Sequence, residues 1–310
     1  MADVRFDGRV AVVTGAGRNL GRAYARLLAS RGAKVVVNDL GVAISDTDGS
    51  GDAPEVNPAH AVVEEIVAAG GEAVVSTGSI SDPDEADGIV AAALDHFGGL
   101  DILINNAGRV RQAPMDEMAP ALVDPVVGTH ILGTINMTRA AWRIMKPRGY
   151  GRIVNISSGA GITGIPNMAV YSMVKLGVVG FTRALALEGA PVGISVNAIA
   201  PYASVRGNDF GPVPWSPSLA EWLSPDQVAP FAVWLCHRDC SVTGECFTVG
   251  GGYVGRLALA QNTGWRGRPL TPERVRDQFV EILGDEESFS ISPAGATGEV
   301  GRIMEGLPGS

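Results

Sequence analysis

The chain has 310 residues, of which 46% are apolar, and carries a formal net charge of −9. This size and composition can bury a substantial core, so we expect one large globular domain or two small ones. The acidic balance argues against nucleic acid or an anionic membrane as the main partner, because both attract basic surfaces. The sequence shows neither 18 uninterrupted apolar residues nor a basic N-terminus followed by an apolar core. We therefore expect neither a membrane span nor a secretory signal.

Three cysteines, Cys236, Cys240 and Cys246, lie close together near the end of the main apolar region. An odd number of cysteines in a long chain is typical of a reducing compartment, so the expected location is cytoplasmic. Their position beside His237 raises the alternative of a metal site. Because the paired Cys-x-x-Cys spacing of such sites is absent, we predict buried thiols and no metal.

The first regular pattern is an apolar run over residues 9–13, followed by a glycine turn from Gly15 to Gly21 and an amphipathic helix that ends at Gly32. A turn of this kind lets a pyrophosphate approach the N-terminus of the helix, which predicts a dinucleotide site. The pattern departs from G-x-G-x-x-G, because Leu20 occupies the last glycine position and Asn19 stands where another glycine is expected. An ordinary tight turn is the alternative.

The second strand, over residues 33–37, ends at Asn38 and Asp39. Asp39 follows Gly15 by about the spacing of the acidic residue that binds the adenosine ribose. A carboxylate at that position accepts from both ribose hydroxyls and repels a 2′-phosphate, which favours NAD over NADP. Arg18 in the glycine turn favours the opposite choice. We expect Arg18 to pair with Asp39 or to point into solvent.

Strand and helix patterns alternate along the rest of the chain, with strands expected around residues 73–75, 100–104, 153–156, 194–199 and 246–249. This alternation predicts an α/β fold, a Rossmann-type doubly wound parallel sheet with helices on both faces. Ligands of such sheets bind beyond the carboxyl ends of the strands. We predict a single domain over residues 1–255 and a C-terminal extension over 256–310, with one short helix at 271–283.

Two segments rich in glycine and proline interrupt this pattern. Residues 41–58 follow the expected ribose-binding strand, and our hypothesis is that they fold over the bound dinucleotide; a surface insertion without a role is the alternative. Residues 203–224 could close over an apolar substrate, with Trp215 and Trp222 as its wall. A surface loop with docked aromatic side chains is the alternative there.

A tyrosine and a lysine lie one helical turn apart, at Tyr171 and Lys175, after a strand that ends in Ser157 and Ser158. The two side chains share a helix face, and an ammonium beside a phenol lowers the pKa of the phenol. The pair could thus supply a general acid or base, and Ser158 could hydrogen-bond the same reacting oxygen. Alone, a Tyr-x-x-x-Lys pair is more often a solvated helix face or a core tyrosine.

With the 14–21 turn, the run Asn105-Asn106-Ala107-Gly108, and Ser158, Tyr171 and Lys175 in order, residues 5–255 resemble the short-chain dehydrogenase/reductase family. The segments VVTGAG, VVVNDLG and MKPRGYGRI are most similar to those of one branch of the family. This branch consists of the (3R)-hydroxyacyl-CoA dehydrogenase domains of multifunctional β-oxidation enzymes, which resemble 17β-hydroxysteroid dehydrogenases. The resemblance implies hydride transfer between NAD and a secondary alcohol or ketone. It implies that Tyr171 is the acid/base, Lys175 holds the nicotinamide ribose, and Ser158 orients the reacting oxygen.

The resemblance extends to further residues. His130 falls where the wider family has an asparagine that takes part in catalysis, and we consider both that role and a packed helix histidine. Ser79 stands where many relatives have an aspartate near the adenine. The implied cofactor contacts come from Gly15, Arg18, Asn19, Leu20, Gly21, Asp39, Ser79, Ile80, Asn106, Ala107, Gly108, Tyr171, Lys175, Pro201, Ala203 and Ser204.

The leading functional hypothesis is NAD-dependent oxidation of a 3-hydroxyacyl-CoA in lipid or sterol side-chain β-oxidation. The alternatives are a hydroxysteroid or simple secondary-alcohol dehydrogenase and, in another class, a non-catalytic NAD-binding regulator. A CoA group needs cationic side chains at the pocket mouth, for which the candidates are Arg109, Arg111, Arg206, Lys146 and Arg148. The resemblance also implies a homodimer or homotetramer built on the helix that begins at Tyr171 and the helix around residues 129–145.

Overall fold

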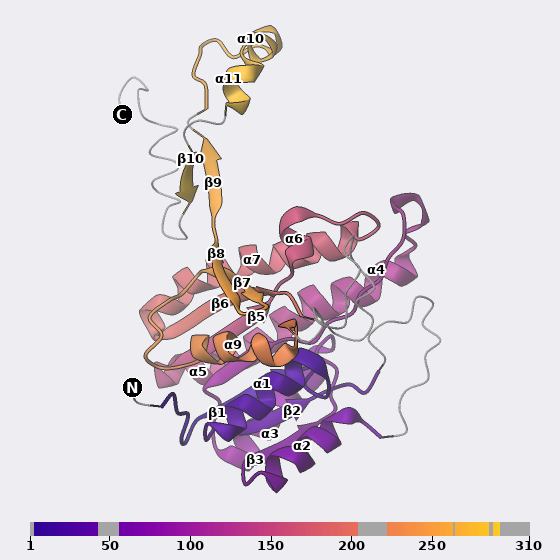
Figure 1. Ribbon diagram of the computed structural model, residues 1–310, viewed down its shortest axis with the longest axis vertical. Coiled ribbons are helices and arrows are strands. Elements are labelled where there is room, and N and C mark those ends of the chain that lie inside the picture. The colour runs from indigo at the N-terminus through magenta and orange to yellow at the C-terminus, as the bar shows by residue number, and fades with distance from the viewer. Residues whose placement is uncertain (1–2, 43–55, 204–221, 263, 285–287, 292–310) are drawn as a thin grey trace. The chain divides into compact units, whose positions relative to one another are not determined.

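Figure 1 shows the computed structural model, which describes residues 3–42, 56–203, 222–262, 264–284 and 288–291. The chain divides into two compact units, Met1–Arg256 and Leu257–Ser310, and each is treated by itself.

An eight-stranded sheet forms the centre of the first unit, with the strand order β3-β2-β1-β4-β5-β6-β7-β8. The pairs from β3 to β7 are all parallel, which confirms the expected Rossmann-type sheet. Only Gly251 and Gly252 join β7 to β8, and both have positive φ (59° and 76°), as a two-residue hairpin turn requires. The strands are β1 Val10–Thr14, β2 Lys34–Asn38, β3 Glu72–Ser76, β4 Ile102–Asn105, β5 Gly151–Ile156, β6 Ile194–Pro201, β7 Cys246–Gly250 and β8 Tyr253–Leu257.

Helices cover both faces of this sheet (Figure 1). Alternate residues of each strand point to opposite faces, so Ala11 and Val13 of β1 pack under α1, α2 and α9, whereas Val10 and Val12 pack under α3 and α5. Burial of both faces explains why the strands are apolar without interruption. The helices are α1 Asn19–Ser30, α2 Pro58–Ala68, α3 Pro83–Phe97, α4 Pro120–Val127, α5 Thr134–Arg148, α6 Gly159–Thr163, α7 Ala169–Gly189 and α9 Ala229–Leu235, with short 3₁₀ turns at Met115–Glu117, Ala190–Val192 and Pro225–Gln227.

Side-chain caps begin three of these helices. Asn57 accepts from the amide of Ala59 at the start of α2, and Asp82 accepts from two amides at the start of α3. Ser158 accepts from the Ala160 amide at the start of α6. Each cap satisfies an amide that lacks a helical partner, so the sequence itself sets where these helices begin.

A π-helical segment, η2 Gly128–Gly133, links α4 to α5 without a break. Such segments are rare and are often found at functional sites, because the wider turn re-aims the side chains it carries. His130 lies in the middle of this segment and is 3% exposed.

By length and composition, residues Ala169–Val192 of the described chain could cross a membrane, with a mean hydropathy of 1.4. However, α7 packs on β6 and α6, and its inward face carries the buried side chain of Lys175. We therefore interpret α7 as a core helix of the sheet domain.

The second unit contains an antiparallel pair, β9 Leu259–Asn262 with β10 Ser288–Ile291, and two short helices. The sequence predicted one helix over residues 271–283. The structure instead shows α10 Pro272–Asp277 and α11 Phe279–Leu283, because Gln278 leaves helical geometry at φ −105° and ψ 9°. Thr271 caps α10 by accepting from the Arg274 amide.

Candidate active site

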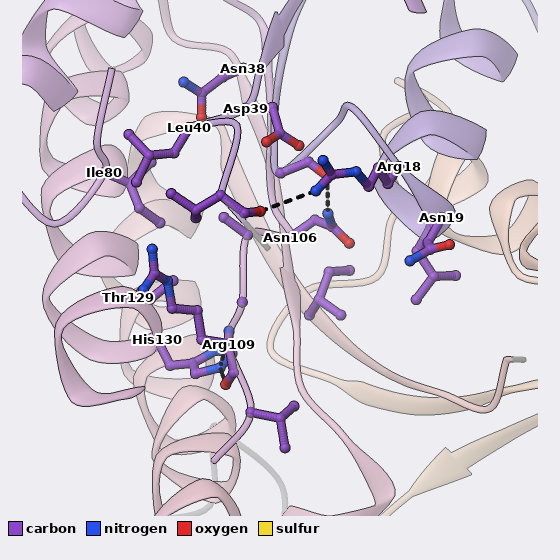
Figure 2. A pocket seen from close by; sticks show the side chains of 18 of the residues that line it. Arg18, Asn19, Asn38, Asp39, Leu40, Ile80, Asn106, Arg109, Thr129 and His130 are labelled. Atoms are coloured by element: carbon purple, nitrogen blue, oxygen red, sulfur yellow. Dashed lines mark hydrogen bonds between the residues drawn. The ribbon is translucent and has the colours of Figure 1, made fainter. Parts of the chain in front are cut away.

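A cavity opens at the carboxyl ends of the strands, where β1 and β4 lie side by side and the strand order reverses. Figure 2 shows Arg18 and Asp39 on one side of it and His130 and Arg109 on another. Every residue predicted to bind cofactor or to take part in catalysis lines this cavity, apart from Ser204, which lies outside the described residues. Residues separated by up to about 190 positions therefore share one site, as the parallel topology requires.

The glycine turn is shaped by close backbone approach. Gly15 has φ 61°, and a Cβ there would lie 2.7 Å from the Cα of Ala107. A Cβ at Gly21 would lie 2.1 Å from the carbonyl oxygen of Gly15. Asn19 has φ 47°, in the left-handed region that asparagine tolerates better than most residues. This conformation explains why asparagine can replace the expected glycine.

Thr14 and Asn106 join this turn to the one after β4. The Thr14 Oγ1 accepts from the amides of Asn106 and Ala107 at 3.0 and 3.1 Å. The Asn106 Nδ2 donates to the carbonyls of Thr14 and Gly15 at 2.9 and 3.0 Å. The two turns therefore form one rigid floor for the cavity.

The Asp39 carboxylate is fixed by main-chain donors. Its Oδ2 accepts from the Gly17 amide and its Oδ1 from the Gly41 amide, both at 2.9 Å. We expected Arg18 to pair with this carboxylate or to point into solvent, and this expectation is wrong. Arg18 instead donates through Nη1 to the Val42 carbonyl at 3.0 Å. The chain after β2 folds back across the glycine turn, and local sequence does not reveal that contact.

The two described ends of the 41–58 segment contact the glycine turn and Asp39. Arg18 holds Val42 at its start, and at its end Asn57 donates through Nδ2 to the Asp39 carbonyl at 2.7 Å. Residues 43–55 lie outside the described residues, so the hypothesis that the segment covers a dinucleotide stays a prediction. The same holds for the substrate lid, because residues 204–221, Trp215 among them, are not described. Trp222 is described and is 65% exposed.

Ser158, Tyr171 and Lys175 meet where β5 ends and α7 begins. Lys175 is 3% exposed and donates through Nζ to the Ile156 carbonyl at 2.6 Å. The same Nζ lies 5.6 Å from the centre of the Tyr171 ring. Ser157, by contrast, donates through Oγ to the Lys175 carbonyl at 2.7 Å, so it fixes the helix to the strand.

Burial shifts the pKa values of Tyr171 and Lys175. It raises the pKa of Tyr171 to about 12, against the lowering effect of a hydrogen bond with Ser158, and it lowers the pKa of Lys175 to about 7. The expectation that Lys175 would lower the pKa of Tyr171 is therefore wrong for this structure. The physical reason is that desolvation disfavours the charged form of each side chain and is the largest cause of each shift.

His130 is held by the main chain of the loop after β4. Its Nε2 lies 2.8 Å from the Arg109 carbonyl oxygen and 3.2 Å from the Arg109 amide nitrogen, so the tautomer decides which contact forms. Its ring meets the Tyr171 ring edge to face, with centroids 5.4 Å apart. Burial, and then the charge of Lys175, hold the pKa of His130 well below its usual value, which favours a neutral imidazole.

The candidate CoA-binding cations do not gather at one place. Arg109 lines the cavity, whereas Arg111 is buried and donates to the Val110 carbonyl. Arg148 pairs with Asp101 at 3.4 Å, beside the amino end of β4 and thus at the opposite edge of the sheet. This position, at the end of α5, removes Arg148 and the neighbouring Lys146 as candidates. Arg206 lies outside the described residues.

The three cysteines are free and buried. Burial raises the pKa of Cys236 and of Cys246, which leaves both thiols protonated and unreactive at neutral pH. Within the described ranges, no three side chains of histidine, cysteine, aspartate or glutamate gather as a metal site would need.

Sequence reasoning missed the contacts of Thr14 beneath the cavity and part of the cavity wall. Thr14 had a detectable signal, because a hydroxyl directly before the first glycine of a strand–turn–helix unit can bond the neighbouring turn. Thr129 had none, since only the π-helical segment brings it to the cavity. The cavity residues not predicted are Asn38, Leu40, Val42, Gly78, Ser81, Val110, Thr129, Ile156 and Ser157.

A serine, a tyrosine and a lysine beside a glycine-turn dinucleotide site define a class of oxidoreductase. The family model described as short chain dehydrogenase matches residues 9–205, and the chain belongs to that family. Among its relatives, the peroxisomal multifunctional enzyme type 2 of Mus musculus is 42% identical over 308 residues, which cover 98% of this chain and 40% of that protein.

Two further comparisons agree with this family. The structure of full-length peroxisomal multifunctional enzyme type 2 from Drosophila melanogaster superposes with a TM-score of 0.79 at 31% identity, covering 97% of this chain and 50% of that chain. The 3-oxoacyl-acyl-carrier-protein reductase of a Synechocystis species is 37% identical over 255 residues, which cover 80% of this chain and 98% of that protein. The chain thus spans about half the length or less of these two multifunctional relatives.

Proposed function

We propose that the protein is an NAD-dependent dehydrogenase that acts on the 3-hydroxyl group of a 3-hydroxyacyl-CoA. One observation carries this proposal: Ser158, Tyr171 and Lys175 line the same cavity as the glycine turn and Asp39. A short-chain dehydrogenase needs those two groups of residues on either side of its reacting centre. A protein that only bound a dinucleotide would have no use for the second group.

The cavity fits a dinucleotide in shape and charge. Neighbouring main-chain atoms exclude a side chain at Gly15 and Gly21. A turn without side chains at these positions lets a pyrophosphate approach the N-terminus of α1. Among the described residues that line the cavity, Arg18, Arg109 and Lys175 are basic and only Asp39 carries a carboxylate. A pyrophosphate would also favour the charged form of Lys175 and so raise the pKa that burial lowers.

Asp39 supports the choice of NAD. Each of its oxygens accepts one main-chain hydrogen bond and has a further lone pair for a ribose hydroxyl. A 2′-phosphate would instead meet a fixed negative charge. Because Arg18 is engaged with the Val42 carbonyl, it is not placed to neutralise that phosphate without first breaking a hydrogen bond.

The chain's residues have separate tasks in the reaction. When bound, a nicotinamide ring supplies the hydride acceptor. As the C3–H bond breaks, Tyr171 would take the proton from the C3 hydroxyl at its phenolic oxygen, and the C3–O bond becomes a carbonyl. Ser158 would donate to that same oxygen and hold it in place. Lys175 in its ammonium form would stabilise the phenolate that must exist before the proton is taken.

The substrate class rests on the relatives. One is named for a multifunctional peroxisomal enzyme and another for reduction of a 3-oxoacyl group on a carrier protein. Arg109 at the cavity wall adds a cation that could contact a phosphate of CoA. A hydroxysteroid or simple secondary alcohol is the alternative, because Ser158 and Tyr171 act only on the carbon that bears the oxygen.

We also propose a homodimer or homotetramer. The outward faces of α5 and α7 expose large apolar side chains, which a second copy of the chain would cover: Ile135, Met173, Leu176 and Leu187. Light scattering on the purified protein tests this assembly, and a monomeric mass would contradict it.

The test of function is a substrate panel of (3R)- and (3S)-hydroxyacyl-CoAs, free secondary alcohols and hydroxysteroids, followed through NADH absorbance. We expect turnover with one hydroxyacyl-CoA series and NAD, and at least about tenfold less with NADP, since a charge clash of about 1.4 kcal/mol already gives that ratio. Turnover confined to steroids would favour the alternative substrate. Tight NAD binding without turnover on any substrate would favour the regulator.

A further inference from the structure

Tyr202 follows β6 directly and is anchored through its main chain. Its amide donates to the Val249 carbonyl at 2.8 Å, which continues the parallel pairing of β6 with β7. Its carbonyl oxygen packs against Gly250, the next residue of β7, where a Cβ would lie only 2.1 Å away. These two contacts hold the main chain of Tyr202 against the end of β7.

The phenol of Tyr202 lies over Gly159, the residue after Ser158. A Cβ at Gly159 would lie 2.3 Å from the Tyr202 hydroxyl oxygen and 2.7 Å from the ring carbon that carries it. Glycine at position 159 is thus what makes room for the phenol. The hydroxyl therefore sits one residue from the serine expected to hold the reacting oxygen.

Among the described residues, this hydroxyl has no hydrogen-bond partner, and Tyr202 is 45% exposed. The neighbouring hydroxyls are engaged: Ser157 donates to the Lys175 carbonyl at 2.7 Å, and Thr163 donates to the Gly159 carbonyl at 3.2 Å. Tyr202 thus presents an exposed hydrogen-bond donor beside Ser158.

We propose that Tyr202 positions the substrate by donating a hydrogen bond to the thioester carbonyl oxygen of a 3-hydroxyacyl- or 3-oxoacyl-CoA. This inference rests on the proposed function, in which Ser158 and Tyr171 hold the oxygen on C3. The thioester oxygen is on C1, one methylene away, so its donor must stand beside Ser158. A simple alcohol has no second oxygen at this place, which makes Tyr202 a residue that selects the thioester.

Two ketones that differ by one oxygen test this role. Acetoacetyl-CoA carries the thioester carbonyl, whereas S-(3-oxobutyl)-CoA has a methylene there and keeps both the C3 ketone and the CoA group. For Tyr202→Phe, which keeps the ring over Gly159, we expect the kcat/KM for acetoacetyl-CoA reduction by NADH to fall about three- to tenfold relative to that for the thioether. The loss follows from one missing hydrogen bond.

The outcomes separate this inference from the proposed function. If wild type reduces neither ketone, the proposed function fails. If wild type reduces acetoacetyl-CoA but Tyr202→Phe loses activity equally on both ketones, or on neither, Tyr202 does not position the thioester. Tyr253→Phe is the matched control, because Tyr253 is an exposed tyrosine of β8 whose hydroxyl lies over Gly255 and not over Gly159, and it should leave both rates unchanged.

A binding measurement guards against a folding artefact. In a Tyr171→Phe background without added NADH, so that no reduction can take place, calorimetry should show that Tyr202→Phe weakens acetoacetyl-CoA binding by the same three- to tenfold factor and leaves thioether binding as it was. The midpoint of thermal unfolding should stay close to that of the parent. Equal weakening for both ligands would overturn the proposal.

Discussion

The two halves of the cavity are built in different ways. Around Gly15, Gly21 and Asp39, main-chain atoms form the cavity. Amides bind the Asp39 carboxylate, and main-chain segments approach one another so closely that only glycine fits. Around Tyr171 and Lys175, side chains form the cavity, and burial sets their protonation.

This difference predicts two kinds of sensitivity. The cofactor half depends on shape, so an added methyl group should damage it whatever the pH. The catalytic half depends on desolvated charge, so its behaviour should change with pH and with the removal of single polar atoms. Substitutions in each half therefore test this contrast.

The largest effect should come from Tyr171→Phe, which removes one oxygen and keeps the ring. A positioned acid/base contributes on the order of 10²- to 10⁴-fold, so kcat should fall by that factor. NAD affinity, measured by fluorescence titration, should change little because the turn proposed to bind the pyrophosphate is intact. A variant with near wild-type kcat would show that Tyr171 is not the acid/base.

Next comes Gly21→Ala, which tests shape. The new Cβ would meet the Gly15 carbonyl at 2.1 Å, and overpacking of this kind costs about 1–3 kcal/mol. We expect a lower midpoint in denaturant unfolding and at least about tenfold weaker NAD binding, equally at pH 6 and pH 9.

The matched control for Gly21→Ala is Gly88→Ala. Gly88 lies on the exposed face of α3, and a Cβ there would meet no atom within 4 Å. It should stabilise the chain by about 0.5–1 kcal/mol, since glycine is a poor helix former. If both variants behaved alike, the close approach at Gly21 would not matter.

Lys175→Met tests charge in the catalytic half. Burial lowers the pKa of Lys175 to about 7 from 10.5, so the folded state binds fewer protons than the unfolded state between these values. The free energy of unfolding of the wild type should therefore rise with pH across that window. At or below pH 7 the methionine variant should be more stable than wild type by on the order of 1–2 kcal/mol, with activity lost.

The stability gain of Lys175→Met should shrink as the pH approaches 10, because the wild-type amine is then increasingly neutral in both states. Denaturant titrations at pH 6, 7, 8 and 9 give the difference directly. A difference that stayed constant with pH would contradict the shifted pKa of Lys175.

The smallest effect is expected for His130→Phe. The variant keeps an aromatic ring against Tyr171 but loses the contact between Nε2 and the Arg109 main chain. One neutral hydrogen bond contributes about 1 kcal/mol, which corresponds to roughly fivefold in kcat if His130 positions the loop. An unchanged kcat with an unchanged unfolding midpoint would leave His130 as packing only.

Much of the fold was readable in advance, for reasons that can be named. Apolar runs that end in glycine or asparagine, alternating with helix-period segments, predicted the order of strands and helices. Thr14 to Gly21, Asn106 to Gly108, and Ser158 with Tyr171 and Lys175 predicted where the site would lie, because parallel strands bring their carboxyl ends together. The boundary at Gln278 was missed, since a single residue that leaves helical geometry has no periodic signal.

Turn, strand and helix preferences act between residues a few positions apart, so the local units and their order could be predicted from the chain alone. Three-dimensional packing sets the partner of Arg18, the raised pKa of Tyr171 and the place of Tyr202 over Gly159. Burial and side-chain contacts depend on atoms from segments that are distant in the sequence. A pattern along one segment therefore does not predict them.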